Sequence, residues 1–511
     1  MAYASKNLSL EEKAAQLLMI DLPDCQELSP RSAAHLGNYA WNGVVLFAKN
    51  VSDLAGTQNL VNQLQEAARY PLYMAIDQEG GLVDRFRFPQ FSLSPGARAL
   101  GALDDPQAVY TAHLIMGREL AQMGIHIDFA PCLDVNNNLA NPIIGVRALA
   151  EEADKVARLG VEAICGLRQG GVIPTAKHFP GHGNTSLDSH LELPIVSGSR
   201  RELEETELLP FRAAIEAQVE AIMTAHILFP AFDPQLPATL SPTILKGLLR
   251  QEMGYEGVIV TDSIAMKSIA NRWGYAQASV MALEAGADLI LAMGSFEEQL
   301  EALEGIVQAV RSGRLSEERL DSSLQRLERW RPYLERRPQE PWTPDPSHRQ
   351  RMEEIIARTP VVWRNRAGLW PLHLEEGAKV AVVSPDLLPQ SPLGEVSLAL
   401  ELAPLLGELG VKAQEFKFNL ASFGPPLNQL KRDLEGFDYI LLALYARGEL
   451  SDSQRELARD LPQICPKTIV LPLSSPYFLE EEGLEGIDTA LTAFNYSTSS
   501  LRALFRKLLG R

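Results

Sequence analysis

The sequence predicts an α/β protein in which a TIM-like (β/α)8 barrel is followed by a smaller flavodoxin-like α/β sandwich domain. Short apolar runs alternate with longer amphipathic segments, a pattern typical of a parallel sheet with helices outside it. Seven or eight such units occur before residue 330, which favours a barrel over the alternative, an open doubly wound sheet. The chain has 511 residues, too many for one ordinary domain, so we expect two domains.

The predicted barrel begins with a helix. Ser9 and Glu12 have the spacing of a capping box, and we expect the helix to run to about Met19. Strand candidates follow as short apolar runs at 43–47, 72–76, 127–130, 172–176, 221–225, 258–261 and 289–292. The amphipathic stretches expected as helices lie between them at 54–70, 106–123, 152–169, 200–217 and 276–285.

The composition changes after residue 330. Five prolines punctuate a polar segment over residues 331–350, which we interpret as a Pro-rich linker. Strand candidates at 379–383, 439–444, 468–473 and 489–493 then alternate with helical segments. The predicted domains are therefore a TIM-like barrel over residues 1–330, the linker, and an α/β sandwich over residues 351–511.

Charge and composition exclude several classes of protein. The net charge of −18 argues against a nucleic-acid partner and against docking on an anionic membrane surface. No run of about 18 apolar residues occurs, and no apolar run near the N-terminus could serve as a signal peptide, so we expect a cytoplasmic protein without a membrane partner. The cysteines follow no CxxC spacing and are expected to be reduced core residues: Cys25, Cys132, Cys165 and Cys465. The oligomeric state does not follow from the sequence.

Polar residues stand at the ends of five predicted strands. In TIM barrels catalytic groups lie at the C-terminal ends of the strands, so these residues predict one polar, catalytic face. They are Asp77, Asp134, Lys177 with His178, His226 and Asp262. We interpret Asp134 and His226 as structural, with Asp134 holding neighbouring loops through backbone hydrogen bonds.

The segment 177–190 has the highest density of reactive side chains in the chain. His178 and His182 have the spacing of a helical zinc pair, but Pro180 and Gly181 between them would break that helix. We therefore predict no metal site. The glycines also lack the spacing of a dinucleotide or phosphate loop, so no cofactor is predicted.

Asp188 and His190 are separated by one residue on a loop rich in small polar residues. A carboxylate beside an imidazole orients the ring and stabilises its protonated form, as a general acid requires near neutral pH. Taken alone, the pair is equally consistent with a role in stabilising the loop.

Four segments carry a family resemblance: DQEGGLVDR at 77–85, NPIIGVR at 141–147, KHFPGHGNTSLDSH at 177–190 and GVIVTDSIAM at 257–266. Together and in this order they resemble the motifs of glycoside hydrolase family 3, specifically its β-N-acetylglucosaminidase branch. The similarity runs from about Leu10 to Leu327. The residue roles and the substrate class given below are what this resemblance implies.

The resemblance implies a retaining β-N-acetylhexosaminidase that removes terminal β-linked N-acetylglucosamine from a carbohydrate through a covalent intermediate. It implies Asp262 as the nucleophile and Asp188–His190 as the acid/base dyad, with His190 transferring the proton. It places five residues at the sugar: Asp77, Arg85, Arg147, Lys177 and His178. Recycling of cell-wall fragments would be a plausible setting for this activity.

Two other enzymes and a non-enzyme stay open as alternatives. A histidine acid/base leaves no carboxylate to repel phosphate, which is compatible with a β-N-acetylglucosaminide phosphorylase. A family 3 β-glucosidase or β-xylosidase is the second alternative, although the Asp188-Ser189-His190 motif argues against it. A sugar-binding protein without activity is the third, and the intact catalytic residues argue against it.

Overall fold

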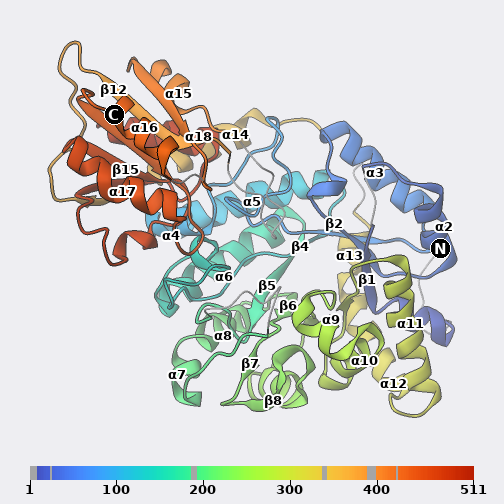
Figure 1. The fold of residues 1–511 in the computed structure, drawn as a ribbon. Coiled ribbons are helices and arrows are strands. Elements are labelled where there is room, and N and C mark those ends of the chain that lie inside the picture. The colour runs from blue at the N-terminus through green and yellow to red at the C-terminus, as the bar shows by residue number, and fades with distance from the viewer. Residues whose placement is uncertain (1–7, 23–25, 186–192, 337–341, 388–398, 422–423) are drawn as a thin grey trace.

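The computed structural model describes residues 8–22, 26–185, 193–336, 342–387, 399–421 and 424–511. Its first sheet has eight strands in the order β10-β1-β2-β3-β4-β5-β6-β9, and all neighbouring strands pair in parallel (Figure 1). The strands are β1 (Leu18–Asp21), β2 (Gly43–Leu46), β3 (Tyr73–Ile76), β4 (Ile127–Asp128), β5 (Ile173–Phe179), β6 (Ala221–Thr224), β9 (Val258–Val260) and β10 (Ile290–Leu291). A parallel bridge between Val260 and Leu289 joins the two ends, so the sheet forms a nearly closed barrel, as predicted.

Helices separate the strands along the chain. They are α1 (Leu10–Ala15), α2 (Pro30–Asn38), α3 (Leu54–Ala67), α4 (Ala97–Leu103), α5 (Pro106–Gln122), α6 (Ala153–Gly170), α7 (Arg200–Glu205), α8 (Leu208–Glu216), the π-helix η5 (Thr243–Glu252), α9 (Lys267–Trp273), α10 (Tyr275–Ala285), α11 (Phe296–Arg311) and α12 (Glu317–Leu327). The predicted helix over 200–217 is therefore two helices, α7 and α8. A short hairpin of β7 (Leu228–Phe229) and β8 (Asp233–Pro237) follows β6.

The start of the barrel differs from the prediction. The capping box of Ser9 and Glu12 is present, but α1 ends at Ala15 and β1 follows at Leu18–Asp21. Gln16 stops the helix, and its side chain donates to two backbone carbonyls just before β2. All four residues of β1 are buried, so the strand lacks the alternation that distinguishes a strand from a helix in sequence.

The C-terminal sheet has six strands in the order β11-β16-β15-β14-β12-β13. Its strands are β11 (Val361–Asn365), β12 (Val380–Pro385), β13 (Ala413–Phe418), β14 (Tyr439–Leu444), β15 (Thr468–Pro472) and β16 (Thr489–Thr492). The five strands from β12 onward have the 2-1-3-4-5 order of flavodoxin, and β11 adds an antiparallel edge. This confirms the predicted sandwich. The edge strands β11 and β13 were not predicted, because they are only partly buried and contain charged residues.

Helices also cover this second sheet: α15 (Leu402–Glu408), α16 (Pro425–Asp433), α17 (Asp452–Ile464) and α18 (Thr498–Leu508). Separate apolar cores lie on its two faces, and a third, larger core fills the barrel. The sandwich, orange to red in Figure 1, lies beside the part of the barrel that carries α4 and α5. No helix in the described part of the chain is long and apolar enough to cross a membrane.

Two helices occupy much of the segment predicted as a linker. They are α13 (Arg331–Leu334) and α14 (Pro346–Arg358). Asp345 caps α14 and Pro346 is its first residue, a position where proline favours a helix start. Because α14 contacts both α5 and α18, it links the barrel to the sandwich. The exact domain boundaries stay a prediction.

Candidate active site

Six of the eight predicted site residues line one cavity of about 390 Å³ in the barrel. They are Asp77, Arg85, Arg147, Lys177, His178 and Asp262. A cavity of this volume falls within the usual range for small-ligand sites. The other two predicted residues, Asp188 and His190, lie outside the described residues, so their place in the site stays a prediction.

The barrel strands deliver four of these six residues. Asp77 directly follows β3, Lys177 and His178 lie near the end of β5, and Asp262 stands two residues after β9. Because all the strands are parallel, their C-terminal ends meet at one face, which is why polar strand ends predicted the site. The two arginines come from the loops after β3 and β4, and only the motif resemblance pointed to them.

A network of buried charges forms one wall of the cavity. Lys177 Nζ lies 2.7 Å from Asp77 Oδ1 and 2.6 Å from Glu79 Oε1. The Arg147 guanidinium donates to both Glu79 oxygens, at 2.7 and 2.9 Å. Burial alone would raise the pKa of the Glu79 carboxyl, but Arg147 and Lys177 hold it well below its ordinary value. Glu79 therefore stays charged at neutral pH.

Glu79 was not among the predicted site residues, although it lies within the first motif. A usable signal was present: Glu79 stands two residues after Asp77, and residues with this spacing share one side of an extended backbone. The chain then turns at Gly80 and Gly81, both with positive φ, at 81° and 64°. A Cβ atom on Gly81 would lie only 2.9 Å from the Gly96 Cα, so this turn requires glycine.

Gln78 fixes the loop that carries Arg85. Its side chain is fully buried, and its Oε1 accepts the backbone N–H groups of Arg85 and Phe86 at 2.8 and 3.2 Å. Its Nε2 donates to Asp84, and its own backbone N–H donates to Asp128 Oδ1 at 2.9 Å. Arg85 Nη2 then lies 3.8 Å from Asp77 Oδ2, on the side of the carboxylate away from Lys177.

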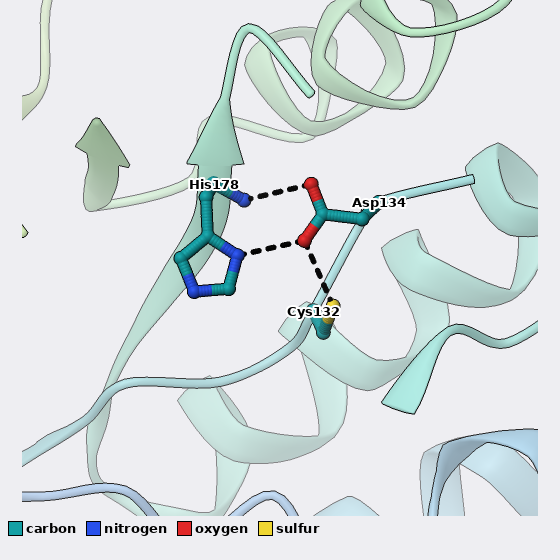
Figure 2. Close-up of side chains that lie close together, drawn as sticks. All are labelled: Cys132, Asp134 and His178. Atoms are coloured by element: carbon teal, nitrogen blue, oxygen red, sulfur yellow. Dashed lines mark hydrogen bonds and ion pairs between the residues drawn. The ribbon is translucent and has the colours of Figure 1, made fainter. Parts of the chain in front are cut away.

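Asp134 organises the segment that contains His178 (Figure 2). Its Oδ2 accepts from His178 Nδ1 at 2.7 Å and from Cys132 Sγ at 3.1 Å. Its Oδ1 accepts the backbone N–H groups of His178 and His182 at 3.2 and 2.7 Å. Because Nδ1 is hydrogen-bonded to Asp134, Nε2 is the ring nitrogen through which His178 can contact a ligand. These bonds agree with the loop-holding role expected of Asp134.

The same three side chains are close enough to suggest a metal site. The possible ligand atoms of Cys132, Asp134 and His178 lie within 4.8 Å of one another. However, the 2.7 and 3.1 Å spacings at Asp134 Oδ2 are shorter than the roughly 3.3–3.5 Å between ligands of a tetrahedral zinc ion. Hydrogen bonds therefore account for the cluster. His182 Nδ1 is 2.9 Å from Thr185 Oγ1 and does not form a helical pair with His178.

His226 supports the segment that follows β9. Its Nδ1 lies 2.7 Å from Thr239 Oγ1, and its Nε2 lies 2.8 Å from the Ser263 carbonyl. The Ser263 backbone N–H in turn donates to Asp262 Oδ1 at 2.7 Å. The buried histidine thus holds Ser263, the residue whose N–H contacts the Asp262 carboxylate, which agrees with the structural role expected of it.

Asn141 connects two of the motif segments. Its Nδ2 donates to the His182 and Gly183 carbonyls at 2.9 and 2.8 Å. Its Oδ1 accepts the backbone N–H groups of Ile143 and Ile144, both at 2.9 Å. One fully buried side chain therefore fixes the segment after β5 against the loop that carries Arg147.

Comparisons with known proteins identify the family of this chain. The family model described as "Glycosyl hydrolase family 3 N terminal domain" matches residues 9–330. Beta-hexosaminidase A of Pseudoalteromonas piscicida is 34% identical over 396 residues, which cover 70% of this chain but less than two thirds, 65%, of that protein. Beta-hexosaminidase of Nitrosomonas eutropha (strain DSM 101675 / C91 / Nm57) is 34% identical over 307 residues, covering 58% of this chain and 87% of that one.

A solved structure resembles the chain over nearly its whole length. The glycoside hydrolase family 3 beta-N-acetylglucosaminidase from Paenibacillus sp. str. FPU-7 superimposes with a TM-score of 0.91 at 35% identity. The superposition covers 98% of this chain and 97% of that one, so both the barrel and the sandwich are shared. Because the family model matches residues 9–330, which is more than half of the chain, the chain belongs to glycosyl hydrolase family 3.

Proposed function

We propose that this protein is a retaining glycoside hydrolase that removes terminal β-linked N-acetylglucosamine. The observation that carries the proposal is the position of Asp262 in one cavity with the charged network of Asp77, Glu79, Arg147 and Lys177. Family membership and the names of the relatives support the class of reaction and the acetamido sugar.

The charged network suits a sugar because it offers both acceptors and donors. The Asp77 side chain is 21% exposed, and each of its oxygens keeps lone pairs for sugar hydroxyl groups beyond its contacts with Lys177 and Arg85. Arg85, Arg147 and Lys177 are charged donors, and charge-assisted hydrogen bonds are the stronger class. We assign sugar binding to these residues and to His178 through Nε2.

Asp262 would act as the nucleophile. Its half-buried carboxylate attacks the anomeric carbon while the glycosidic C–O bond breaks, which gives a covalent glycosyl-enzyme. The leaving oxygen takes a proton from His190, which Asp188 orients. Water then attacks the anomeric carbon, gives its proton to His190 and releases the sugar with its configuration retained. The roles of Asp188 and His190 are assigned from their sequence motif alone.

The phosphorylase is the second candidate, because phosphate can replace water in the second step beside a histidine acid/base. A β-glucosidase is the third. A role in cell-wall recycling and a cytoplasmic location stay predictions of the sequence.

The test compares nitrophenol release from the β-N-acetylglucosaminide and the β-glucoside, with and without phosphate. We expect a strong preference for the acetamido sugar and no sugar phosphate. Preference for the glucoside would contradict the substrate, and phosphate-dependent formation of a sugar 1-phosphate would identify a phosphorylase. Retention is tested by methanolysis followed by NMR. The anomer of the methyl glycoside that forms first shows whether the configuration is retained.

The Asp262→Ala variant tests the nucleophile, with Asp104→Ala on an exposed helix end as the control. Turnover should be nearly abolished in the first and unchanged in the second. Activity of Asp262→Ala within about tenfold of the wild type, or ~1.4 kcal/mol of barrier, would remove Asp262 from this role.

A further inference from the structure

The C-terminal sandwich lies directly behind the two loops that supply Arg85 and Arg147 to the cavity. We name them the first cavity loop, residues 77–96, and the second cavity loop, residues 141–151. Leu82 and Val146, one from each loop, belong to the same apolar core as the buried side chains of the sandwich. Within the described part of the chain, every residue lining the cavity lies between Val45 and Met293. The sandwich therefore lies outside the cavity, and its described residues add no side chain to the lining.

A polar cluster joins the ends of both loops to the sandwich. Arg98 stands two residues after the first cavity loop, and Glu151 is the last residue of the second. Arg98 Nε lies 3.1 Å from Glu151 Oε1 and 3.0 Å from the hydroxyl of Tyr477, which belongs to the sandwich. The Tyr477 hydroxyl donates to the same Glu151 oxygen. We call these three side chains the Tyr477 cluster.

The Tyr477 cluster is well shielded from solvent. Tyr477 is 4% exposed, and the Arg98 and Glu151 side chains are 11% and 26% exposed. The Arg98 guanidinium also lies 5.0 Å from the centre of the Phe494 ring, another side chain of the sandwich. Burial raises the pKa of the Tyr477 hydroxyl above its ordinary value, so it is a neutral donor at neutral pH.

The first cavity loop has further contacts with the sandwich. The Asn495 side chain donates to the Pro95 carbonyl at 3.5 Å. The Arg87 guanidinium lies 5.7 Å from the centre of the Tyr496 ring, and its Nη2 donates back to the Leu82 carbonyl at 3.1 Å. The sandwich therefore contacts this loop before Arg85, through Leu82 in the shared apolar core, and after Arg85, at Arg87 and Pro95.

The second cavity loop lies against the backbone of the sandwich. Gly145 has a φ of 44°, and a Cβ atom there would lie 3.7 Å from the Arg447 carbonyl oxygen. A Cβ atom on Gly448 would lie 3.5 Å from Pro142 Cβ. Arg147 stands two residues after Gly145, so this contact lies immediately behind the guanidinium that pairs with Glu79.

We propose that the sandwich is a positioning element for sugar binding, and that Tyr477 is its main positioning residue. Tyr477 holds Arg98 and Glu151, and these two hold the loops that present Arg85 and Arg147 to the cavity. The inference rests on the proposed function, because it assigns these arginines to the sugar. Tyr477 itself touches neither the sugar nor the reacting atoms.

The Tyr477→Phe variant tests the proposal, and Tyr439→Phe is the matched control. Tyr439 is also a buried tyrosine of the sandwich, 5% exposed, but its hydroxyl donates to the His373 carbonyl at 3.1 Å, away from the barrel. Both variants lose one hydroxyl from the same domain. The two loops are expected to bind the sugar equally well in the ground state and in the transition state, and losing such uniform binding raises KM without changing kcat. We therefore expect Tyr477→Phe to raise KM about three- to tenfold with kcat nearly unchanged.

The measurements are kcat and KM on the aryl N-acetylglucosaminide, the affinity for free N-acetylglucosamine by calorimetry, and the thermal midpoint. The affinity should fall by the same factor as KM rises in Tyr477→Phe, and neither should change in Tyr439→Phe. Equal KM and equal affinity in the two variants would overturn the proposal. If Tyr477→Phe does not fold, Glu151→Gln removes the same anchor and must show the same rise in KM.

The result separates this inference from the proposed function. A wild-type protein that neither binds nor cleaves the acetamido sugar would overturn both. An active wild type with no difference between Tyr477→Phe and Tyr439→Phe would overturn the positioning role alone.

Discussion

Replacing Glu79 by glutamine perturbs the centre of the charged network. Glutamine preserves the shape of the side chain but removes the carboxylate that faces both Arg147 and Lys177. Lys177 keeps Asp77 as a partner, whereas the Arg147 guanidinium loses its ion pair with Glu79 and one of the two hydrogen bonds, because an amide has only one oxygen to accept them. We therefore expect Glu79→Gln to lower the free energy of unfolding and to weaken sugar binding together.

The size of the loss in the free energy of unfolding follows from the burial of Glu79 and Arg147. The Glu79 and Arg147 side chains are only 5% and 7% exposed, so water is a poor substitute for the missing partner. Removing one member of a buried ion pair costs about 3–5 kcal/mol. Because Lys177 retains Asp77, we expect the lower end, about 3 kcal/mol at pH 7. Since the pKa of Glu79 is lowered by folding, its contribution is present above about pH 4.5 and is lost as the pH falls further.

The assay is a double-mutant cycle of Glu79→Gln and Arg147→Met, measured by urea unfolding. Removing both partners leaves no unpaired charge, so the double variant should lose about 1–3 kcal/mol less than the sum of the single losses. A single loss below about 1 kcal/mol for Glu79→Gln, or losses that add within about 0.5 kcal/mol, would refute the reasoning. The difference between wild type and Glu79→Gln should also shrink below about pH 4.5.

Three other side chains give separate predictions. Asp134→Asn should lower kcat/KM at least about tenfold, because an amide cannot hold the His178 ring with a charge, and an unchanged kcat/KM would contradict this role. Burial raises the pKa of Asp84 to about 6, so its protonated form stabilises the fold below about pH 4, and this contribution is lost as the pH rises through 6. The free energy of unfolding of Asp84→Asn should therefore rise relative to that of the wild type from pH 4 to 7, by up to about 3 kcal/mol. Identical pH profiles of urea unfolding for the two proteins would rule this out. Burial lowers the pKa of His113 to about 4, so the unfolded chain takes up the proton first and the wild type loses stability as the pH falls from about 6.5 to 4. His113→Leu should flatten this part of the profile by up to about 3 kcal/mol, and parallel curves would show that another group titrates.

Much of the fold was predictable because each barrel strand is a short apolar segment between helices. Strand β14 was predicted with its observed bounds, and the barrel strands from β2 onward lie where the apolar runs placed them. Strand β1 was missed because an apolar run buried on both faces has no period of its own. Strand β13 was missed for the opposite reason, since an exposed edge strand carries charges.

The site shows the same division. Polar residues at strand ends identified Asp77, Lys177, His178 and Asp262, because parallel strands must bring their ends to one face. Glu79 was overlooked, although its spacing from Asp77 is informative. The two arginines needed the motif resemblance, because a loop residue has no fixed direction until the loop is folded.

The sequence alone determined the barrel, the sandwich and the face of the barrel on which chemistry occurs, because these depend on local periodicity and on strand direction. Only the tertiary structure decided which charges pair. Glu79 and Arg147 are 68 residues apart, Asp77 and Lys177 are 100 apart, and Glu151 and Tyr477 are 326 apart. No local pattern encodes such distances, because they depend on how the loops turn and on how the sandwich packs behind them.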